Sequence, residues 1–241
     1  MKKKNLLKAV CFGVVLLTGT GTWQSRVKAA QTNDSVSVGK VGVSDDFALG
    51  MDISSVIALE NAGVTYYDQD GNKKDLFTLA KEGGCNYIRI RIWNDPKDSS
   101  GKYYGGGNND LNCGVKIGKR ATEAGMKVLI DLHYSDFWTD PSKYIAPKAW
   151  SSLSTDETAV QIGEWTKTVL DTFADNNIDV GMIQVGNEIN TGFVGELTWS
   201  RSGVLNKTWA DYLNAGLNSV SLWNEENNKN VNNLDVPYTS T

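Results

Sequence analysis

Polar and aromatic side chains gather where four predicted strands of this sequence end. Because the carboxyl ends of parallel strands meet at one edge of a sheet, we expect these side chains to lie close together. They are Asp52 at the first strand; Arg89, Arg91, Trp93 and Asn94 at the second; Asp131, His133, Tyr134, Asp136 and Trp138 at the third; and Asn187 and Glu188 after the fourth.

This mixture of acids, amides and aromatic rings suits the chemistry of sugars. An aromatic ring packs on the apolar face of a pyranose, while Asn, Asp and Arg bind its hydroxyl groups. Cleavage of a glycosidic bond needs a protonated carboxyl group for the leaving oxygen. In a retaining enzyme a second carboxylate, about 5–5.5 Å away, acts as the nucleophile. We assign the proton donor to Glu188, within Gln184-Val185-Gly186-Asn187-Glu188-Ile189.

Two arginines share one face of the second predicted strand. Side chains alternate along a strand, so Arg89 and Arg91 lie on the face opposite the isoleucines. If the isoleucines face the helices, both arginines point into the barrel. Buried arginines need carboxylate partners, because an unpaired buried charge is very costly. We expect Glu188 and Asp52 to be these partners.

Short apolar runs alternate with longer amphipathic runs from residue 47 onward. The runs predict four strand–helix units, which indicate a parallel sheet with helices packed outside it. The predicted strands cover 47–53, 87–93, 127–133 and 180–185, with a small hairpin at 64–72. The predicted helices cover 75–82, 112–124, 155–176 and 208–225, the third with a stripe of Ile162, Trp165, Val169 and Phe173.

The loop positions favour a (β/α)8 barrel as the fold class. The long loops rich in Gly and Trp all follow strands, and such loops build the active-site face of a barrel. A doubly wound open sheet is the alternative, but no glycine-rich phosphate loop follows the first strand. Residues 230–241 lose the pattern and do not give the compact apolar strand that should follow the fourth helix.

The N-terminus has the features of a secretory signal peptide. Basic residues precede an apolar run of nine residues, Ala9 to Leu17, and Val27-Lys28-Ala29-Ala30 resembles a cleavage site. An uncleaved anchor is the alternative, although the run is shorter than the roughly 20 residues that span a bilayer. The sequence therefore predicts a signal peptide at 1–29, a flexible leader at 30–45 and a secreted mature protein.

Charge and cysteine content exclude several classes of partner and site. Without residues 1–29 the chain keeps 18 basic against 28 acidic residues, a net charge of −10. Nucleic acid and anionic membranes need a positive surface and are therefore not expected partners. Cys85 lies at the beginning of a predicted strand, and Cys113 at the start of the next helix, beside the far end of that strand. This separation is too long for a disulfide, so we expect two free thiols. No metal-ligand spacing is present.

Taken singly, each of these features also has a structural explanation. An Asn-Glu dipeptide commonly caps a loop, His133 can be a buried structural residue, and Trp93 and Trp138 can fill the core. Two arginines on a strand can lie on a solvated edge. The joint placement of these residues at strand ends favours a binding or catalytic role.

Four sequence segments together resemble glycoside hydrolase family 53. They begin at Phe47-Ala-Leu-Gly-Met-Asp52, Arg89-Ile-Arg91-Ile-Trp93, His133-Tyr134-Ser135-Asp136 and Gln184-Val-Gly186-Asn187-Glu188, within a resemblance that runs from about 47 to 225. The family consists of arabinogalactan endo-β-1,4-galactanases, which cut the type I arabinogalactan of pectin. The resemblance implies a clan A (β/α)8 barrel, a retaining mechanism, a monomer, a polysaccharide substrate, and neither a cofactor nor a catalytic metal.

The resemblance also implies roles for individual residues. Glu188 would be the acid/base, Asn187 would bind a sugar hydroxyl, and Arg89 or Arg91 would orient the nucleophile. The residues expected to line the substrate cleft are Asp52, Trp93, Asn94, His133, Asp136 and Trp138.

The family's nucleophile is a glutamate at the end of the seventh strand, and we find no matching segment. The acidic residues after Glu188 that we considered do not resemble it: they are Glu196, Asp211, Glu225, Glu226 and Asp235. We therefore expect 46–229 to be the N-terminal portion of the barrel, with about four βα units, and 230–241 to be an unmatched tail. Another clan A glycosidase, of mannanase or cellulase type, and a non-catalytic carbohydrate-binding fragment stay open as alternatives.

Overall fold

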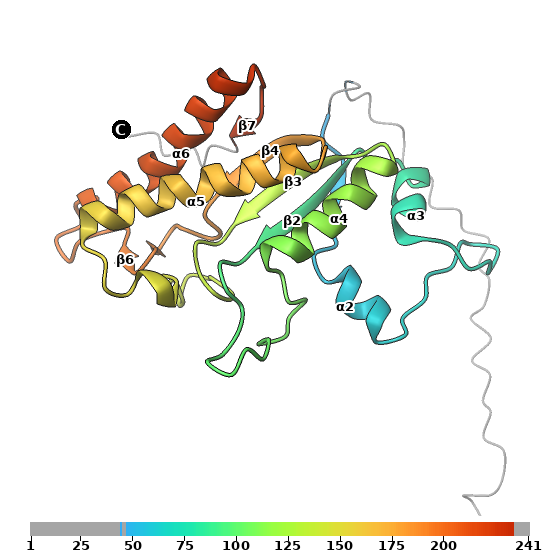
Figure 1. Cartoon of the computed structure of the whole chain (residues 1–241), viewed down its shortest axis with the longest axis horizontal. Coiled ribbons are helices and arrows are strands. Elements are labelled where there is room, and N and C mark those ends of the chain that lie inside the picture. The colour runs from blue at the N-terminus through green and yellow to red at the C-terminus, as the bar shows by residue number, and fades with distance from the viewer. Residues whose placement is uncertain (1–43, 45–46, 234–241) are drawn as a thin grey trace, which may run out of the picture. The chain divides into compact units, whose positions relative to one another are not determined.

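The computed structural model describes residue 44 and residues 47–233 (Figure 1). The chain divides into two units, Met1–Ser44 and Asp45–Thr241. The fold below is that of the second unit. The predicted signal peptide, nearly all of the predicted leader, and residues 234–241 lie outside the described residues.

A parallel sheet forms the centre of this unit. Its strands are paired in the order β1-β2-β3-β4-β7, and they comprise Gly50–Asp52, Tyr87–Ile92, Lys127–Leu132, Val180–Val185 and Asn232–Asn233. Each strand of this sheet therefore pairs with the strand of the sheet that comes before or after it in the sequence. An open doubly wound sheet reverses its strand order at a switch point, whereas a barrel adds strands in sequence. The order observed is that of a (β/α)8 barrel.

Helices connect the strands. These are α2 (Val56–Asn61), α3 (Leu76–Glu82), α4 (Leu111–Glu123), α5 (Thr155–Asp175) and α6 (Lys207–Asn227), with a 3-10 turn η1 (Lys148–Trp150) and a short antiparallel pair, β5 (Gly192–Phe193) and β6 (Glu196–Leu197). Side-chain caps start four of them: Asp75, Asp110, Ser154 and Asn206 each accept a backbone N–H. Within the described residues, no helix is long and apolar enough to cross a membrane.

The strand alternation predicted for β2 is confirmed. Ile88, Ile90 and Ile92 are fully buried in the core beneath the helices. At Gly114 of α4 an added Cβ would lie 2.3 Å from the Ile92 Cδ1 atom, so only glycine lets the helix approach this closely. Arg89 and Arg91 consequently occupy the opposite face of the strand, as expected.

Several expected elements differ in the structure. The first strand spans three residues instead of 47–53, and the predicted hairpin at 64–72 is a single bridge between Tyr67 and Lys73. The helix α2 was not predicted. No compact apolar strand follows the fourth helix within the described residues, but Asn232 and Asn233 form a two-residue strand that pairs in parallel with Met182 and Ile183 of β4.

Both remaining cysteines are free, as predicted, and half-buried. Burial, with a further contribution from the negative charge of Asp110, raises the pKa of the Cys113 thiol to about 11. The thiol is therefore protonated at neutral pH, and Cys113 is a packing residue of α4 rather than a nucleophile.

Candidate active site

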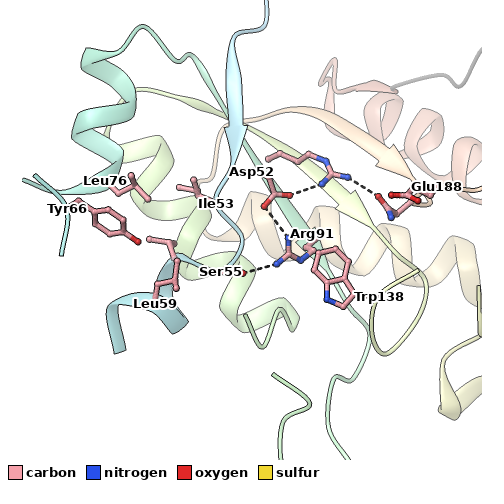
Figure 2. Close-up of a pocket in the computed structure, with 12 residues that line it drawn as sticks. Asp52, Ile53, Ser55, Leu59, Tyr66, Leu76, Arg91, Trp138 and Glu188 are labelled. Carbon is pink, nitrogen blue, oxygen red and sulfur yellow. Dashed lines mark hydrogen bonds and ion pairs between the residues drawn. The ribbon is translucent and has the colours of Figure 1, made fainter. Parts of the chain in front are cut away.

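A cavity of about 590 Å³ opens at the carboxyl ends of β1, β2 and β4 (Figure 2). Six of the ten residues predicted for the site line it: Asp52, Arg89, Arg91, Trp138, Asn187 and Glu188. The rest of its lining is mainly apolar and comes from α2, α3 and the segments beside them: Ile53, Ser55, Val56, Leu59, Tyr66 and Leu76. The cavity thus has a charged side at the strand ends and an apolar side at the helices.

Arg89 connects three strands at the floor of this cavity. Its Nη1 donates to the Asp52 Oδ2 atom at 2.7 Å, and its Nη2 donates to the Asp131 Oδ2 atom at 2.7 Å and to the Asn187 Oδ1 atom at 3.1 Å. The register explains this geometry: Asp52 pairs with Arg89 across β1 and β2, and Asp131 lies on the next strand. Charge-assisted bonds of this kind fix the guanidinium plane.

Arg91 lies two residues beyond Arg89 on β2, and its side chain is more buried, 8% exposed against 29%. It donates to Asp52 Oδ1 at 3.3 Å, to Ser55 Oγ at 2.9 Å and to the Gly106 carbonyl at 3.1 Å. Its guanidinium carbon lies 4.1 Å from the centre of the Trp138 ring, within cation–π range. Burial lowers the pKa of Arg91, and the negative charge of Asp52 opposes this shift.

Asp52 is held as a carboxylate between the two arginines. Burial alone would raise its pKa, but hydrogen bonds from Ser54 and the charges of Arg91 and Arg89 outweigh burial, so the pKa lies below its ordinary value. The expectation that Glu188 would be the second carboxylate partner was wrong. Asp131, fully buried on β3, takes that place.

Asn187 and Glu188 are adjacent but lie in different environments. Asn187 is buried, and both ends of its amide are bonded, Oδ1 to Arg89 and Nδ2 to the Thr139 carbonyl at 2.8 Å. Glu188 is exposed and has a backbone φ of +50°, in the left-handed region. Non-glycine residues rarely adopt this region, which costs about 1–2 kcal/mol. The turn sends the Glu188 side chain to the cavity, where it has no ion-pair partner among residues 47–233.

Aromatic side chains extend from the cavity into the loops after β2 and β3. Trp138 is 39% exposed, which leaves part of its ring free for a ligand. Trp93 is fully buried behind it, with ring centres 5.5 Å apart. An added Cβ at Gly106 would lie 3.2 Å from both tryptophans, and its φ of +65° also favours glycine. Trp93 therefore supports Trp138 rather than lining the cavity itself.

Three further predicted residues do not line this cavity. Asp136 accepts backbone N–H groups of Asp95 and Lys148 and so joins two loops, while Asn94 donates its N–H to the Ser135 carbonyl. His133 is buried next to Asp131. Within the residues that the structure describes, no group of three or more His, Cys, Asp or Glu side chains could hold a metal ion.

Three residues that contribute to the site had been given no role in it. Asp131 was expected among the strand-end residues but not as a partner of Arg89. Gln184, whose Oε1 accepts from Arg89 Nη2 at 3.4 Å, lies on β4 on the strand face opposite the buried Ile183 and Val185. Thr139 lies in a loop and bonds His133 and Asn187, and no local pattern marks it.

The chain is similar in sequence to several galactanases. It is 53% identical over 160 residues to the endo-beta-1,4-galactanase of Bacillus subtilis, a match that covers 66% of this chain and 37% of that protein. It is 38% identical over 148 residues to the arabinogalactan endo-beta-1,4-galactanase A of Aspergillus niger, covering 61% of this chain and 40% of that protein. The chain thus spans about two fifths of the length of these relatives.

Solved structures are similar in fold. The GH53 catalytic domain of Ignisphaera aggregans superposes with a TM-score of 0.71 at 40% identity, over 76% of this chain and 50% of that one. A fungal beta-1,4-galactanase superposes with a TM-score of 0.63 at 29% identity, over 73% of this chain and 49% of that one. The fold is therefore that of part of a (β/α)8 barrel. Residues 48–237 match the model of glycosyl hydrolase family 53, and the chain belongs to this family.

Proposed function

We propose that this chain supplies the acid/base side of the active site of a secreted, retaining endo-β-1,4-galactanase that acts on type I arabinogalactan. The observation that carries the proposal is the position of Glu188, on the turn after β4, at a cavity lined by Asp52, Arg89, Arg91 and Trp138. The galactanases among its relatives support the choice of substrate. Glu188 acts first as the general acid and then as the general base, as a retaining mechanism requires.

Glu188 lines the cavity without being held by an arginine. No arginine or lysine of residues 47–233 pairs with its carboxyl group, whereas both nearby arginines are already neutralised by Asp52 and Asp131. The Glu188 carboxyl group is therefore not held by another side chain of these residues, which leaves it available to the leaving oxygen.

The neighbouring residues would bind the sugar. The free part of the Asn187 amide would meet a hydroxyl, and the exposed part of the Trp138 ring would stack on a pyranose face. The other four predicted residues support the site indirectly, because they hold its loops and side chains in place: Trp93, Asn94, His133 and Asp136. This assignment narrows the direct substrate contacts to the residues that line the cavity.

Retention also requires a nucleophilic carboxylate about 5–5.5 Å from the acid/base. We assign this role to neither Asp52 nor Asp131, because their bonds to the arginines hold both carboxylates at the strands and Asp131 is fully buried. Arg89 or Arg91, both of which line the cavity, would orient an incoming nucleophile. We consequently expect little hydrolysis by these 241 residues alone.

A complementation assay tests the proposal. The purified chain is mixed with the portion of the Bacillus subtilis galactanase that follows its 160 matched residues, and galacto-oligosaccharide release from pectic galactan is measured. We expect release from the mixture and little from either part. Glu188→Gln should lower the rate by about 100-fold or more, the size of a general-acid contribution. Clear release by the chain alone would contradict the division of the site.

The controls separate the remaining alternatives. Glu225→Gln changes an exposed carboxylate of α6 and should leave the rate of the mixture unchanged. Hydrolysis of mannan or cellulose in preference to galactan would favour another clan A glycosidase. Galactan binding that survives Glu188→Gln, without hydrolysis in any mixture, would favour a carbohydrate-binding role.

We also propose a processing scheme: a signal peptide at 1–29, a leader at 30–45, a catalytic portion at 46–229 and a tail at 230–241. The basic start and apolar run of the first 30 residues support it. N-terminal sequencing of the protein secreted by an expressing host should begin at Ala30. A product that retains Met1 in the membrane fraction would contradict cleavage.

A further inference from the structure

Five residues at the strand ends form a closed circuit of contacts. Arg89 Nη2 donates to Asp131 Oδ2 at 2.7 Å and to Asn187 Oδ1 at 3.1 Å. Asn187 Nδ2 donates to the Thr139 carbonyl at 2.8 Å, and the Thr139 N–H donates to His133 Nδ1 at 3.2 Å. His133 Nε2 lies 3.0 Å from Asp131 Oδ2, which closes the circuit.

Every member of this circuit except Arg89 is buried. Asp131 and His133 are at most 1% exposed, Thr139 is 5% exposed and Asn187 is 9% exposed. Buried polar groups that lose a partner are costly, so each bond restricts the next. The circuit thus connects His133, which does not line the cavity, to the side-chain amide of Asn187, which does.

The circuit fixes which part of the Asn187 amide faces a ligand. The Oδ1 atom is turned toward Arg89, and one Nδ2 proton is turned toward the Thr139 carbonyl. A flipped amide would place NH2 against the guanidinium and oxygen against the carbonyl, two repulsive contacts. The remaining Nδ2 proton is the group left for the cavity, so Asn187 can donate to a sugar oxygen.

The same contacts fix the tautomer of His133. The Thr139 N–H can donate only to an unprotonated Nδ1. The hydroxyl of Thr139 also lies 2.9 Å from Nδ1, and it donates its proton to the Asn187 backbone carbonyl at 3.3 Å. On the other side, Nε2 must carry the proton, because a lone pair 3.0 Å from the Asp131 carboxylate would be repelled. The Nε2–H is not aimed along a hydrogen bond to this oxygen, so the contact is electrostatic.

We propose that His133 is a positioning residue that, as the Nε2–H tautomer, sets the donor orientation of Asn187 through Thr139. The importance of that orientation for sugar binding rests on the proposed function. The positioning itself does not, because it is present without a ligand. Its test can therefore succeed or fail independently of any galactanase activity.

The first test uses the fact that His133 is the only histidine in the sequence. In the full chain labelled with ¹⁵N-histidine, the two ring nitrogens give an unambiguous pair of NMR signals. We expect the shifts of an unprotonated Nδ1 and a protonated Nε2 at neutral pH. The Nδ1–H tautomer or a doubly protonated ring would overturn the proposal, and no variant is needed for this measurement.

The second test follows the Asn187 side-chain amide with ¹⁵N-asparagine labelling, its signals being assigned by their loss in Asn187→Asp. One amide proton should be protected from solvent exchange. His133→Asn keeps an acceptor near the Nδ1 position and should preserve this signal. His133→Gln keeps a polar group only near Nε2, and the protected proton should exchange about tenfold faster.

Thr166→Val is the matched control, because it removes another buried threonine hydroxyl, bonded to Tyr134 and outside the circuit. It should leave the Asn187 signals unchanged, whereas Thr139→Val should shift them and Thr139→Ser should restore them. Equal effects of His133→Asn and His133→Gln, or an Asn187 amide that no His133 or Thr139 variant moves, would overturn the positioning role.

Discussion

The two sides of the cavity differ in how completely their side chains are paired. On the charged side, Asp52, Arg89 and Asn187 line the cavity and are bonded to one another or to the buried Asp131 behind them, which lies against His133. The apolar side, which comprises Leu59, Tyr66 and Leu76, presents half-buried or exposed carbon to the cavity (Figure 2). Glu188 shares the openness of the apolar side, although it follows directly after Asn187.

This difference separates stability from chemistry. A substitution on the charged side leaves a partner buried without compensation, so it should lower the free energy of unfolding. A substitution of Glu188 leaves no such partner within residues 47–233, so it should affect catalysis alone. The predictions below use this contrast, from the largest expected change in unfolding free energy to the smallest.

Arg89→Met should lower the free energy of unfolding by about 3 kcal/mol, measured by urea denaturation. The reason is that Asp131, fully buried, would lose its guanidinium partner, and Asp52 would lose one of two.

Arg120→Met is a closely matched control for Arg89→Met. The Arg120 side chain is 30% exposed, against 29% for Arg89, and it also pairs with two carboxylates, Glu60 and Asp75. Those carboxylates are 32% and 46% exposed and can be hydrated, so we expect a loss of about 1 kcal/mol. Equal losses for the two arginines would contradict the view that burial of the partner sets the cost.

Asp52→Asn should lower the free energy of unfolding by about 2 kcal/mol at pH 7, because two arginines lose charge compensation. Its folded pKa is below the ordinary value, so its contribution is fully present above the ordinary carboxyl pKa of about 4. The contribution is lost as the pH falls through the folded pKa. The difference between the wild type and Asp52→Asn in urea denaturation should therefore shrink below about pH 4.

Glu225→Gln, at an exposed position of α6, corrects this pH series for the general effect of removing one negative charge. A stability difference for Asp52→Asn that stays constant between pH 7 and pH 3 would show that its folded pKa is not coupled to folding.

Sequence periodicity predicted the charged side better than the open side. The alternation of β2 identified both arginines and their face, because a buried parallel strand repeats every two residues. The bounds of β4 were predicted as 180–185 and found there. Alternation gives the face of a strand but not the height along the barrel. For this reason we expected Glu188 to pair with an arginine, whereas Asp131 of the neighbouring strand β3 is the carboxylate that Arg89 reaches.

The parts that were missed depend on tertiary contacts. The helix α2 has six residues and no side-chain cap, so it shows little more than one and a half turns of periodicity. The strand β7 consists of two asparagines, which have low strand propensity, and pairing with β4 alone makes it a strand. Thr139 bonds partners 6 and 48 positions away, which no local pattern reveals.

Glu188→Gln should change the free energy of unfolding by less than about 0.5 kcal/mol, although it should abolish the proposed acid/base chemistry. The two amino acids have the same shape, and the Glu188 carboxylate has no ion pair among residues 47–233 that the substitution could break. Glu188→Gly should instead stabilise the fold by about 0.5–1 kcal/mol, because glycine adopts the φ of +50° without strain. Urea denaturation of both variants checks this, with Asn228→Gly, at a φ of +49° on the C-cap of α6, as the matched control for the glycine effect. A loss of 2 kcal/mol in Glu188→Gln would mean that Glu188 belongs energetically to the charged side, and the contrast between the two sides would fail.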